Sequence, residues 1–498
     1  MMTLTPDSRL PAPDEGLALW RAGRLDEALE VLGRALDARP HDAVLRTSFG
    51  LVLASLGLAD AASAAWRQVL ALAPVQPAAL VNLANAVGDA PGAGERARLL
   101  CRRALAADAA DAAALGNLGV HEERRGARSP ARRFYRRALA LMPAEARLWS
   151  NLGSLEHWDG RLAAAGRSLD RALALVPDFA AARFDRAVNR LLQGDEARGL
   201  AEYEWRWRRP SPPRPAFGLE RWDGAPLAGR RLLLWTEQGF GDAIQFARFA
   251  GHLRDGAAAL LCQAPLLRLM RSVEGLAAVA AYGESVPAAD LEAPLMSLPH
   301  LLGVRLSEPT MTRPYLAADA ADVARWRPFL YGLPQGMPRI GVVWSGRPDY
   351  AQDRARSLPP AALAPLLSLR GFIFVSLQHG DRQDIAAQPS PLAAPLATPQ
   401  RPRAFVDFAD TAALISGLDL VIAADTAVAH LAGALARPVW ILLPKVPDWR
   451  WGMSGASTPW YPSARLFRQG QAGDWSDVVA AVMAALPTAL PMALPAAR

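Results

Sequence analysis

A pattern of glycine, alanine and proline that returns every 34 residues constrains the first 210 residues more than any other feature of the sequence. The interval grows by one residue between Pro74 and Ala109, and we place this insertion in residues 88–95. A period of this length is typical of a solenoid whose repeats pack only against their neighbours. The pairs that keep the 34-residue interval are Gly23 and Gly57, Ala28 and Ala62, Pro40 and Pro74, Gly119 and Gly153, Pro143 and Pro177, and Gly160 and Gly194.

Each half-repeat has the pattern of an amphipathic helix, as Leu162, Leu169 and Leu173 illustrate. Glycine gives the joint between two helices its backbone freedom, and proline ends the second helix. The period and the ending "RALALxP" resemble the tetratricopeptide repeat. The resemblance implies an α-solenoid of about six repeats over residues 1–210, the first and third imperfect. Such a superhelix binds a protein or peptide in its concave face, and a purely architectural spacer is the alternative.

The periodicity changes after a proline- and glycine-rich stretch, and we predict a linker at residues 211–227. Short apolar runs then alternate with helical segments, an order that predicts parallel sheets with helices on both faces. We expect two such α/β units, at 228–334 and 335–490, followed by a tail at 491–498. Ligands of such sheets bind at the carboxyl ends of the strands. Residues 385–403 are predicted to form a mobile proline-rich loop.

Composition excludes several classes of protein. The net charge of +7 comes almost entirely from arginine, since Lys445 is the one lysine. No reader fold or clustered charge accompanies it, so we do not expect a nucleic-acid partner. Cys101 and Cys262 stand far apart, which excludes a disulfide scaffold and fits a reducing compartment. The sequence predicts neither a signal peptide nor a transmembrane segment, and we expect a cytoplasmic protein.

The first candidate site is the turn that ends in Asp242. Gly239 and Gly241 lie between an apolar run and a helical segment, where they allow a ligand to approach the backbone. Asp242 at the start of the helix could act as a general base. Alternatively, Asp242 and Gln245 form a capping box.

The second candidate follows the apolar run LDLVIAA. Thr426 and His430 are four residues apart, so they share one face of a helix close to its N-terminus. The free N–H groups there suit a diphosphate. Asp425 carries the wrong charge for phosphate, and we expect it to orient backbone or a neighbouring hydroxyl. A buried structural histidine is the alternative for His430.

The third candidate follows the apolar run IGVVW. It combines Ser345 with the arginines Arg347, Arg354 and Arg356, whose guanidinium groups suit phosphate oxygens. Gln378 ends the next apolar run and could contact a nucleotide base. A solvated loop is the alternative for the arginines.

A fourth segment is aromatic and includes Trp449, Trp451, Trp460 and Tyr461. These rings could stack on a sugar or base, or they could close the domain core. The sequence has no Asp-x-Asp pair or comparable ligand cluster, so we predict no metal and no other cofactor.

The second half resembles the GT-B glycosyltransferases of family nine, the heptosyltransferase group. The resemblance rests on LLLWTEQGFGDAIQFARF, GVVWSGRP, RARSLP, DTAVAHLAGAL and PDWRW. It implies a GT-B fold of two Rossmann-like, doubly wound sheets and a metal-independent active site. It further implies that Asp242 is the base, that Asp425, Thr426 and His430 contact the donor, and that Arg356 replaces a phosphate-binding lysine. Ala427 stands where the family usually has glycine.

The whole chain is similar to bacterial proteins that join tetratricopeptide repeats to such a domain, with a weaker likeness to protein O-linked N-acetylglucosamine transferases. We therefore expect a glycosyltransferase that moves a hexosyl or heptosyl group from a nucleotide-sugar donor to a protein or glycan acceptor, with repeats that recognise an acceptor or partner. The alternative is a non-catalytic scaffold whose GT-B domain is degenerate.

Overall fold

The chain forms two compact units, Met1–Asp185 and Arg186–Arg498. The computed structural model describes residues 13–87, 92–209, 214–237, 239–306, 313–348, 350, 352–379, 396–399 and 405–490. Gln238 lies outside these ranges. Of the loop predicted at 385–403, only residues 396–399 lie within them, and the structure does not describe the rest.

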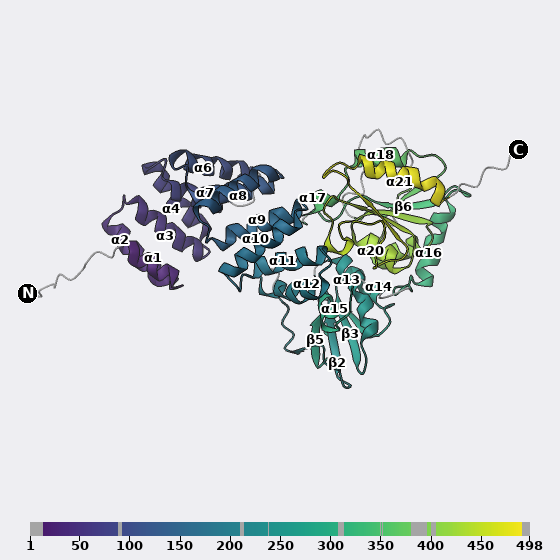
Figure 1. Cartoon of the computed structure of the whole chain (residues 1–498). Coiled ribbons are helices and arrows are strands. Elements are labelled where there is room, and N and C mark those ends of the chain that lie inside the picture. Colours follow the sequence, from purple (N-terminus) through teal and green to yellow (C-terminus); the bar gives the residue numbers. More distant parts are fainter. Residues whose placement is uncertain are drawn as a thin grey trace, which may run out of the picture. The chain divides into compact units, whose positions relative to one another are not determined.

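The first unit consists of antiparallel helix pairs, which Figure 1 shows stacked along the chain. This confirms the helical repeat array that the 34-residue period predicts. The last of its helices, α11, continues into the second unit. The helices are α1 (Pro13–Arg21), α2 (Leu25–Ala38), α3 (Ala43–Ser55), α4 (Ala59–Leu72), α5 (Pro77–Ala86), α6 (Ala93–Ala107), α7 (Ala112–Arg124), α8 (Arg128–Leu141), α9 (Ala146–Trp158), α10 (Leu162–Leu175) and α11 (Ala180–Leu192).

Glycines with positive φ make the turn inside each helix pair. Their φ angles lie between 74° and 83°, in the left-handed region that a side chain disfavours. The one longer interval, 35 residues, separates Gly57 from Gly92, in agreement with the insertion placed at 88–95. The glycines of this set are Gly23, Gly57, Gly92, Gly126, Gly160 and Gly194.

Two further contacts hold a repeat together. A Cβ on Gly119 would lie 2.4 Å from the ring of Tyr135, so glycine on the first helix makes room for a large side chain on the second. Arg137 on α8 also donates a hydrogen bond of 3.3 Å to the carbonyl of Ala109, in the turn before α7. Arg103 makes the equivalent bond of 2.7 Å to Pro74. The arginine thus ties the second helix to the turn preceding the first.

The second unit contains two parallel five-stranded sheets, as the alternating pattern predicts. The first has the strand order β1-β5-β2-β3-β4 and the second the order β10-β9-β8-β6-β7. The strands are β1 (Glu220–Arg221), β2 (Arg231–Trp235), β3 (Ala257–Cys262), β4 (Leu276–Ala281), β5 (Leu291–Pro294), β6 (Arg339–Val343), β7 (Ile373–Ser376), β8 (Leu420–Ala424), β9 (Val439–Leu443) and β10 (Ala464–Arg468).

Helices cover both sheets. The α-helices are α12 (Glu196–Tyr203), α13 (Phe240–Phe246), α14 (Leu267–Met270), α15 (Leu298–Leu301), α16 (Ala320–Tyr331), α17 (Asp353–Arg356), α18 (Pro360–Leu367), α19 (Phe408–Ile415), α20 (Ala427–Ala434) and α21 (Ser476–Ala489). The 3₁₀ turns are η1 (Glu204–Arg208), η2 (Ala247–His252), η3 (Ala264–Leu266), η4 (Leu295–Ser297) and η6 (Trp449–Trp451).

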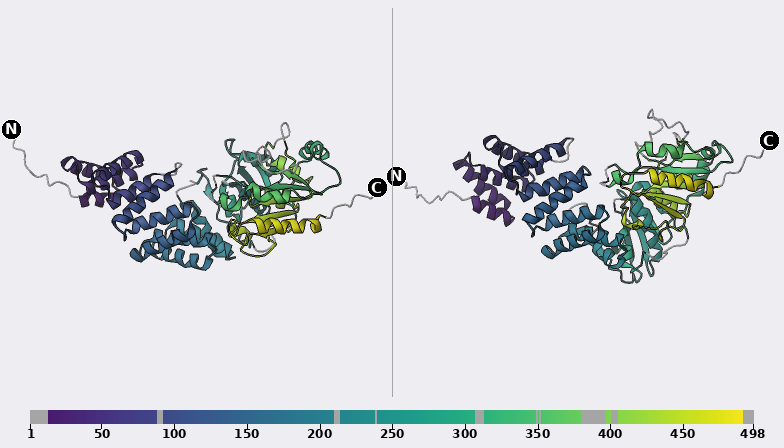
Figure 2. Two further views of the ribbon diagram at one scale, coloured as in Figure 1. Left: turned by 90° about the horizontal axis from the view of Figure 1, so that it is seen from above. Right: turned by 45° about the horizontal axis from the view of Figure 1, so that its top comes forward.

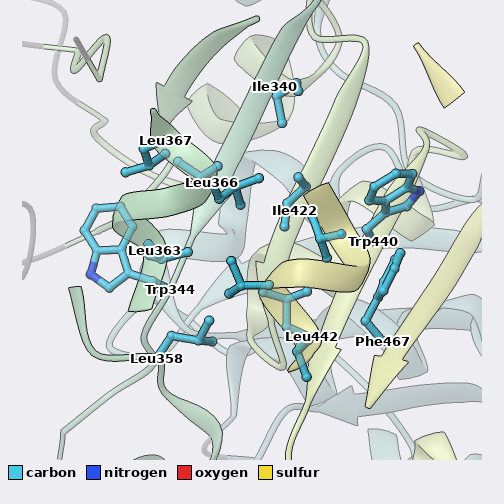
Figure 3. Close-up of a cluster of buried hydrophobic side chains, with 14 of the residues drawn as sticks. Ile340, Trp344, Leu358, Leu363, Leu366, Leu367, Ile422, Trp440, Leu442 and Phe467 are labelled. Atoms are coloured by element: carbon cyan, nitrogen blue, oxygen red, sulfur yellow. The ribbon is translucent and has the colours of Figure 1, made fainter. Parts of the chain in front are cut away.

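One face of the second sheet carries a large hydrophobic core. Side chains of α18 and α21 pack there against Ile340, Ile422 and Trp440 on three of its strands. Figure 3 shows this cluster. Figure 1 labels α18 and α21 next to each other, and the right-hand view of Figure 2 shows the yellow α21 beside the green α18. Because α18 and α21 occupy this face, α19 and α20 pack on the other, toward the first sheet.

The structure differs from the sequence predictions in its shortest elements. The sequence patterns do not predict β1, β4, β5 and β10, and α14 is a single turn. β5 has four residues and ends in proline, while β4 is rich in alanine and has Val279 as its one β-branched residue, so both are poor in the side chains typical of strands. None of the helices in the described ranges is both long and apolar enough to cross a lipid bilayer.

Candidate functional site

The strand order of the second sheet creates a place for a ligand. β6 and β8 are neighbours, yet the chain continues from β6 outward to β7 before it returns to β8 on the other side. Ligands of doubly wound sheets bind at such a reversal, beyond the carboxyl ends of the two strands. Ser345 lies two residues after β6, and Asp425 follows β8 directly. The topology therefore brings two of the predicted site segments together.

Two buried hydroxyl groups at this reversal lack a hydrogen-bond partner among the described residues. They are Oγ of Ser345 and Oγ1 of Thr426, on side chains that are 5% and 8% exposed. Thr426 is the N-cap residue of α20, but its side chain does not cap the helix. Buried polar groups nearly always have a partner, so both hydroxyls are available to a bound ligand.

The opposite side of the site is formed by α13, the helix that follows β2 of the first sheet, and by the glycines at its start. Gly239 is the N-cap residue of α13, where a Cβ would lie 2.2 Å from Oδ2 of Asp242. A Cβ on Gly241 would lie 2.9 Å from Cδ2 of His430. The absence of both side chains lets the Asp242 carboxyl group fold over the helix start and lets α13 touch α20. Asp242 and His430 consequently belong to one site.

Arg450 connects the two halves of this site. Its Nη2 donates to Oδ1 of Asp242 at 2.6 Å, and its Nε donates to Oε1 of Gln245 at 2.6 Å. Because Gly239, and not Asp242, is the N-cap residue of α13, the capping-box interpretation of Asp242 and Gln245 is wrong. The third nitrogen, Nη1, donates to Oδ1 of Asp448 at 2.7 Å.

A second buried arginine, Arg248, extends from the first half of this unit into the second half. Arg248 on η2 donates to the carbonyl of Trp460 at 2.8 Å and to the hydroxyl of Tyr315 at 3.0 Å. Its guanidinium also lies 4.8 Å from the centre of the Tyr461 ring. Each half of the second unit therefore inserts one arginine into the other.

The environment of Asp242 favours its use as a base. Burial raises the pKa of its carboxyl group above the usual range, while Arg450 lowers that pKa and Asp448 raises it. Although protein surrounds the residue, 33% of its side chain remains exposed. The carboxyl group is thus open to a small molecule and titrates nearer to neutral pH than an ordinary aspartate.

His430 is neutral in this site. Burial, followed by the nearby arginines, lowers its pKa well below the usual value. Its Nδ1 is 2.9 Å from the hydroxyl of Tyr461, and its ring stacks on Trp451 at 5.2 Å. Nε2 lies 4.0 Å from Oδ1 of Asp425, whose own pKa is raised by burial. A neutral imidazole can donate one hydrogen bond to a ligand oxygen.

Arg356 provides a cation beside this group. A Cβ on Gly346 would lie 2.4 Å from its Nη2, so a side chain at position 346 would displace the guanidinium from this place. The guanidinium lies 4.5 Å from the centre of the Tyr350 ring, and its Nε is 3.4 Å from Oδ1 of Asp353. The charge of Arg356 lowers the pKa values of Asp242 and Asp425. Arg347 and Arg354 are exposed.

Gln378 holds the loop after β6. Its Oε1 accepts hydrogen bonds from the backbone N–H groups of Trp344 and Ser345 at 3.3 and 3.2 Å. Its Nε2 donates to the carbonyl of Ser345 at 3.0 Å. These bonds fix the backbone of Ser345, and a contact of Gln378 with a nucleotide base stays a prediction.

The aromatic segment belongs to the core. Trp449, Trp451, Trp460 and Tyr461 are between 1% and 7% exposed, which favours the structural alternative. Arg450, which stands between Trp449 and Trp451 in the sequence, is the residue that the sequence reasoning missed. The sequence does indicate a role for it, because an arginine within a segment of buried aromatic residues needs a buried hydrogen-bonding or charged partner.

The comparisons with known proteins match both units. The sequence model of glycosyltransferase family 9 (heptosyltransferase) matches residues 404–472, which contain Asp425, Thr426, His430 and Arg450. Protein FlbA of Caulobacter vibrioides is 30% identical over 502 residues, covering 96% of this chain and 72% of FlbA.

Solved structures resemble the N-terminal part. A thermophilic TPR protein of Thermus thermophilus is 25% identical, with a TM-score of 0.33, over 36% of this chain and 100% of its own. PilW, a type IV pilus biogenesis factor, is 18% identical with a TM-score of 0.35, over 39% of this chain and 88% of its own.

Proposed function

This chain belongs to the family of Protein FlbA, with tetratricopeptide repeats before a domain of glycosyltransferase family 9, and we propose that it transfers a sugar from a nucleotide-sugar donor to a hydroxyl group of a protein or glycan. The observation that carries this proposal is the contact of Gly241 with His430. It joins the Gly-Asp turn of one sheet to the Asp-Thr-x-x-x-His segment of the other. The proposal includes a GT-B arrangement, in which donor and acceptor meet between two such sheets.

Asp242 is the proposed base. Its carboxylate accepts the proton of the acceptor hydroxyl while the oxygen of that hydroxyl attacks the anomeric carbon of the donor. The bond from this carbon to the phosphate oxygen breaks, and the nucleotide leaves with the electron pair. A base is most effective when its pKa lies close to the working pH, and burial moves Asp242 in that direction.

The donor side of the proposed site stabilises the departing phosphate. Thr426 presents an unpartnered hydroxyl at the N-terminus of α20, where the helix dipole favours negative charge. His430 and Arg356 supply a neutral donor and a cation. Ser345 offers a second free hydroxyl, Asp425 orients its neighbours, and Gln378 holds the loop. The proposal requires no metal and no further cofactor.

Substitution of the base tests this mechanism. We expect Asp242→Asn to lower kcat by about 100- to 10,000-fold, because a positioned base contributes that much, and to leave nucleotide binding intact. Asp290→Asn, the same change at an exposed aspartate before β5, is the matched control. Rates are measured with a panel of nucleotide sugars. Unchanged turnover in folded Asp242→Asn would contradict the assignment.

A non-catalytic scaffold is the second candidate, because Ala427 replaces the glycine usual at the start of the donor helix. Calorimetric titration with nucleoside mono- and diphosphates separates the two. Binding that is lost in Thr426→Val supports the transferase. A folded protein that binds none of these nucleotides supports the scaffold.

A further inference from the structure

Arg450 is a buried cation in the interior of the second unit, and all of its guanidinium nitrogens are hydrogen-bonded. Only 6% of its side chain is exposed, and each of its three guanidinium nitrogens donates to a different side chain. Two of these partners, Asp242 and Gln245, lie on α13, more than 200 positions earlier in the chain. The third, Asp448, lies two residues before it. The planar guanidinium therefore fixes the direction of each acceptor relative to the others.

The backbone of Arg450 is fixed as well. Its carbonyl accepts a hydrogen bond of 3.0 Å from Nε1 of Trp460, and its N–H donates to Oδ1 of Asp448 at 3.1 Å. The rings of Trp449 and Phe246 lie 4.6 and 5.4 Å from its guanidinium carbon. A side chain held in this way cannot follow a movement of Asp242; instead it sets where that carboxylate points.

We propose that Arg450 is the positioning residue of the base: it aims the Asp242 carboxylate from the opposite half of the site and keeps it ionised, and it divides its charge between Asp242 and Asp448. This inference rests on the proposed role of Asp242. The inference also gives Asp448 a role, because a second carboxylate bound to the same guanidinium weakens the electrostatic attraction between Arg450 and Asp242.

The other charges near Asp242 do not replace this contact. Several ionisable groups face the carboxylate from the surrounding elements. They are Arg450 of η6 with the preceding Asp448, Arg356 of α17 with the nearby Tyr350, Arg206 of η1 with the preceding Tyr203, Glu237 after β2, and the neutral His430 of α20. Among the cations of this set, Arg450 has the largest effect and contacts Asp242 directly.

The signs of the expected shifts follow from these charges. Removal of Arg450 takes away the nearest cation, so the pKa of Asp242 rises and the acid limb of the pH–rate profile moves to higher pH. Removal of the Asp448 charge takes away a nearby anion, so the same limb moves to lower pH. A nearby opposite charge changes a carboxyl pKa by about 1 to 3 units, which is the shift expected for Arg450→Met.

The experiment compares three variants of the full chain. Arg450→Met should move the acid limb of kcat/KM upward by at least about one pH unit. Arg248→Met is the control, since this arginine is also buried between the two halves but does not contact Asp242. Asp448→Asn keeps the oxygen that accepts from the Arg450 N–H and should move the limb downward. A limb that stays in place in Arg450→Met or Asp448→Asn, or that moves equally in Arg248→Met, would overturn the proposal.

A second readout does not depend on turnover. The carboxyl ¹³C resonance of Asp242, identified by its loss in Asp242→Asn, can be titrated in protein labelled at aspartate. An Asp242 titration that moves upward in Arg450→Met and downward in Asp448→Asn supports the proposal even if the protein transfers no sugar. Titration curves that do not change in these variants overturn the proposal. Should Arg450→Met fail to fold, Asp448→Asn decides, because the Asp448 side chain is 30% exposed.

Discussion

The absence of a side chain at a single glycine allows helices from the two sheets to approach each other closely. The start of α13 touches α20 at Gly241, where there is no room for one further carbon. Gly346 has the same role beside Arg356. Glycine at these two positions reflects a close approach of other groups and not a special backbone angle, because neither has a positive φ.

Gly241→Ala tests this contact. We expect the added methyl group to lower the free energy of unfolding by about 1–3 kcal/mol, the usual cost of overpacking, and to weaken nucleotide binding. Gly251→Ala is the matched control, since a Cβ there meets only the carbonyl oxygen of Glu274, at an ordinary 3.9 Å. Urea unfolding and calorimetry measure the two effects. Equal stability of both variants would show that His430 moves aside freely.

The sequence predicted the candidate residues but not the bonds between them. Asp242, Thr426 and His430 could be selected because each follows an apolar run at the start of a helix. Their meeting depends on contacts between distant segments, such as the approach of Gly241 to His430 and the bonds of Arg450 to α13, whose residues lie more than 200 positions earlier. No local pattern encodes a contact over such a distance. The same holds for Gln378, whose amide is directed by the backbone of Ser345.

Elements were predictable where a pattern was long or strongly apolar. The repeat helices follow from the 34-residue period, and β2, β3, β6, β7, β8 and β9 follow from apolar runs between turns. β10 escaped prediction because arginine stands at two of its five positions. Its pairing with β9 stabilises it, and that pairing is a tertiary effect.

Arg137 is expected to stabilise its repeat through the turn that it reaches. Arg137→Met should speed hydrogen exchange in the turn around Ala109 by about 2- to 10-fold, because a hydrogen bond contributes about 0.5–1.5 kcal/mol. Arg133→Met, at an exposed position of the same helix, is the control. Mass spectrometry of peptides over residues 105–115 measures the effect. Equal exchange in the two variants would remove this role from Arg137.

At the scale of the whole molecule, the candidate site lies entirely in the second unit. Arg206 of η1 forms ion pairs with Glu204 and Glu237, at 2.7 and 2.8 Å, so the segment after α12 also belongs to that unit. The repeats contribute none of the residues that we assign to the chemistry. The proposed function therefore predicts that recognition of an acceptor and transfer of the sugar are separable.

A fragment that begins at Ala180, and so keeps α11 whole, tests this separation. We expect it to hydrolyse the nucleotide sugar at a rate close to that of the full chain but to lose transfer to a protein acceptor. Circular dichroism verifies its fold, and product analysis by mass spectrometry measures both activities. Parallel loss of hydrolysis and transfer would mean that the repeats serve only as support.

The reciprocal arginines Arg248 and Arg450 limit how such proteins can recombine. Consider a chimaera that joins the part of this chain before β6 to the second half of a relative. It contains Arg248, but the relative need not have Trp460 and Tyr461 at the positions that Arg248 contacts. It also inherits Asp242 without a guarantee of Arg450. We therefore expect that the specificity of the proposed donor site is changed more safely by substituting single residues than by exchanging a whole half. We also expect the two halves to have evolved together.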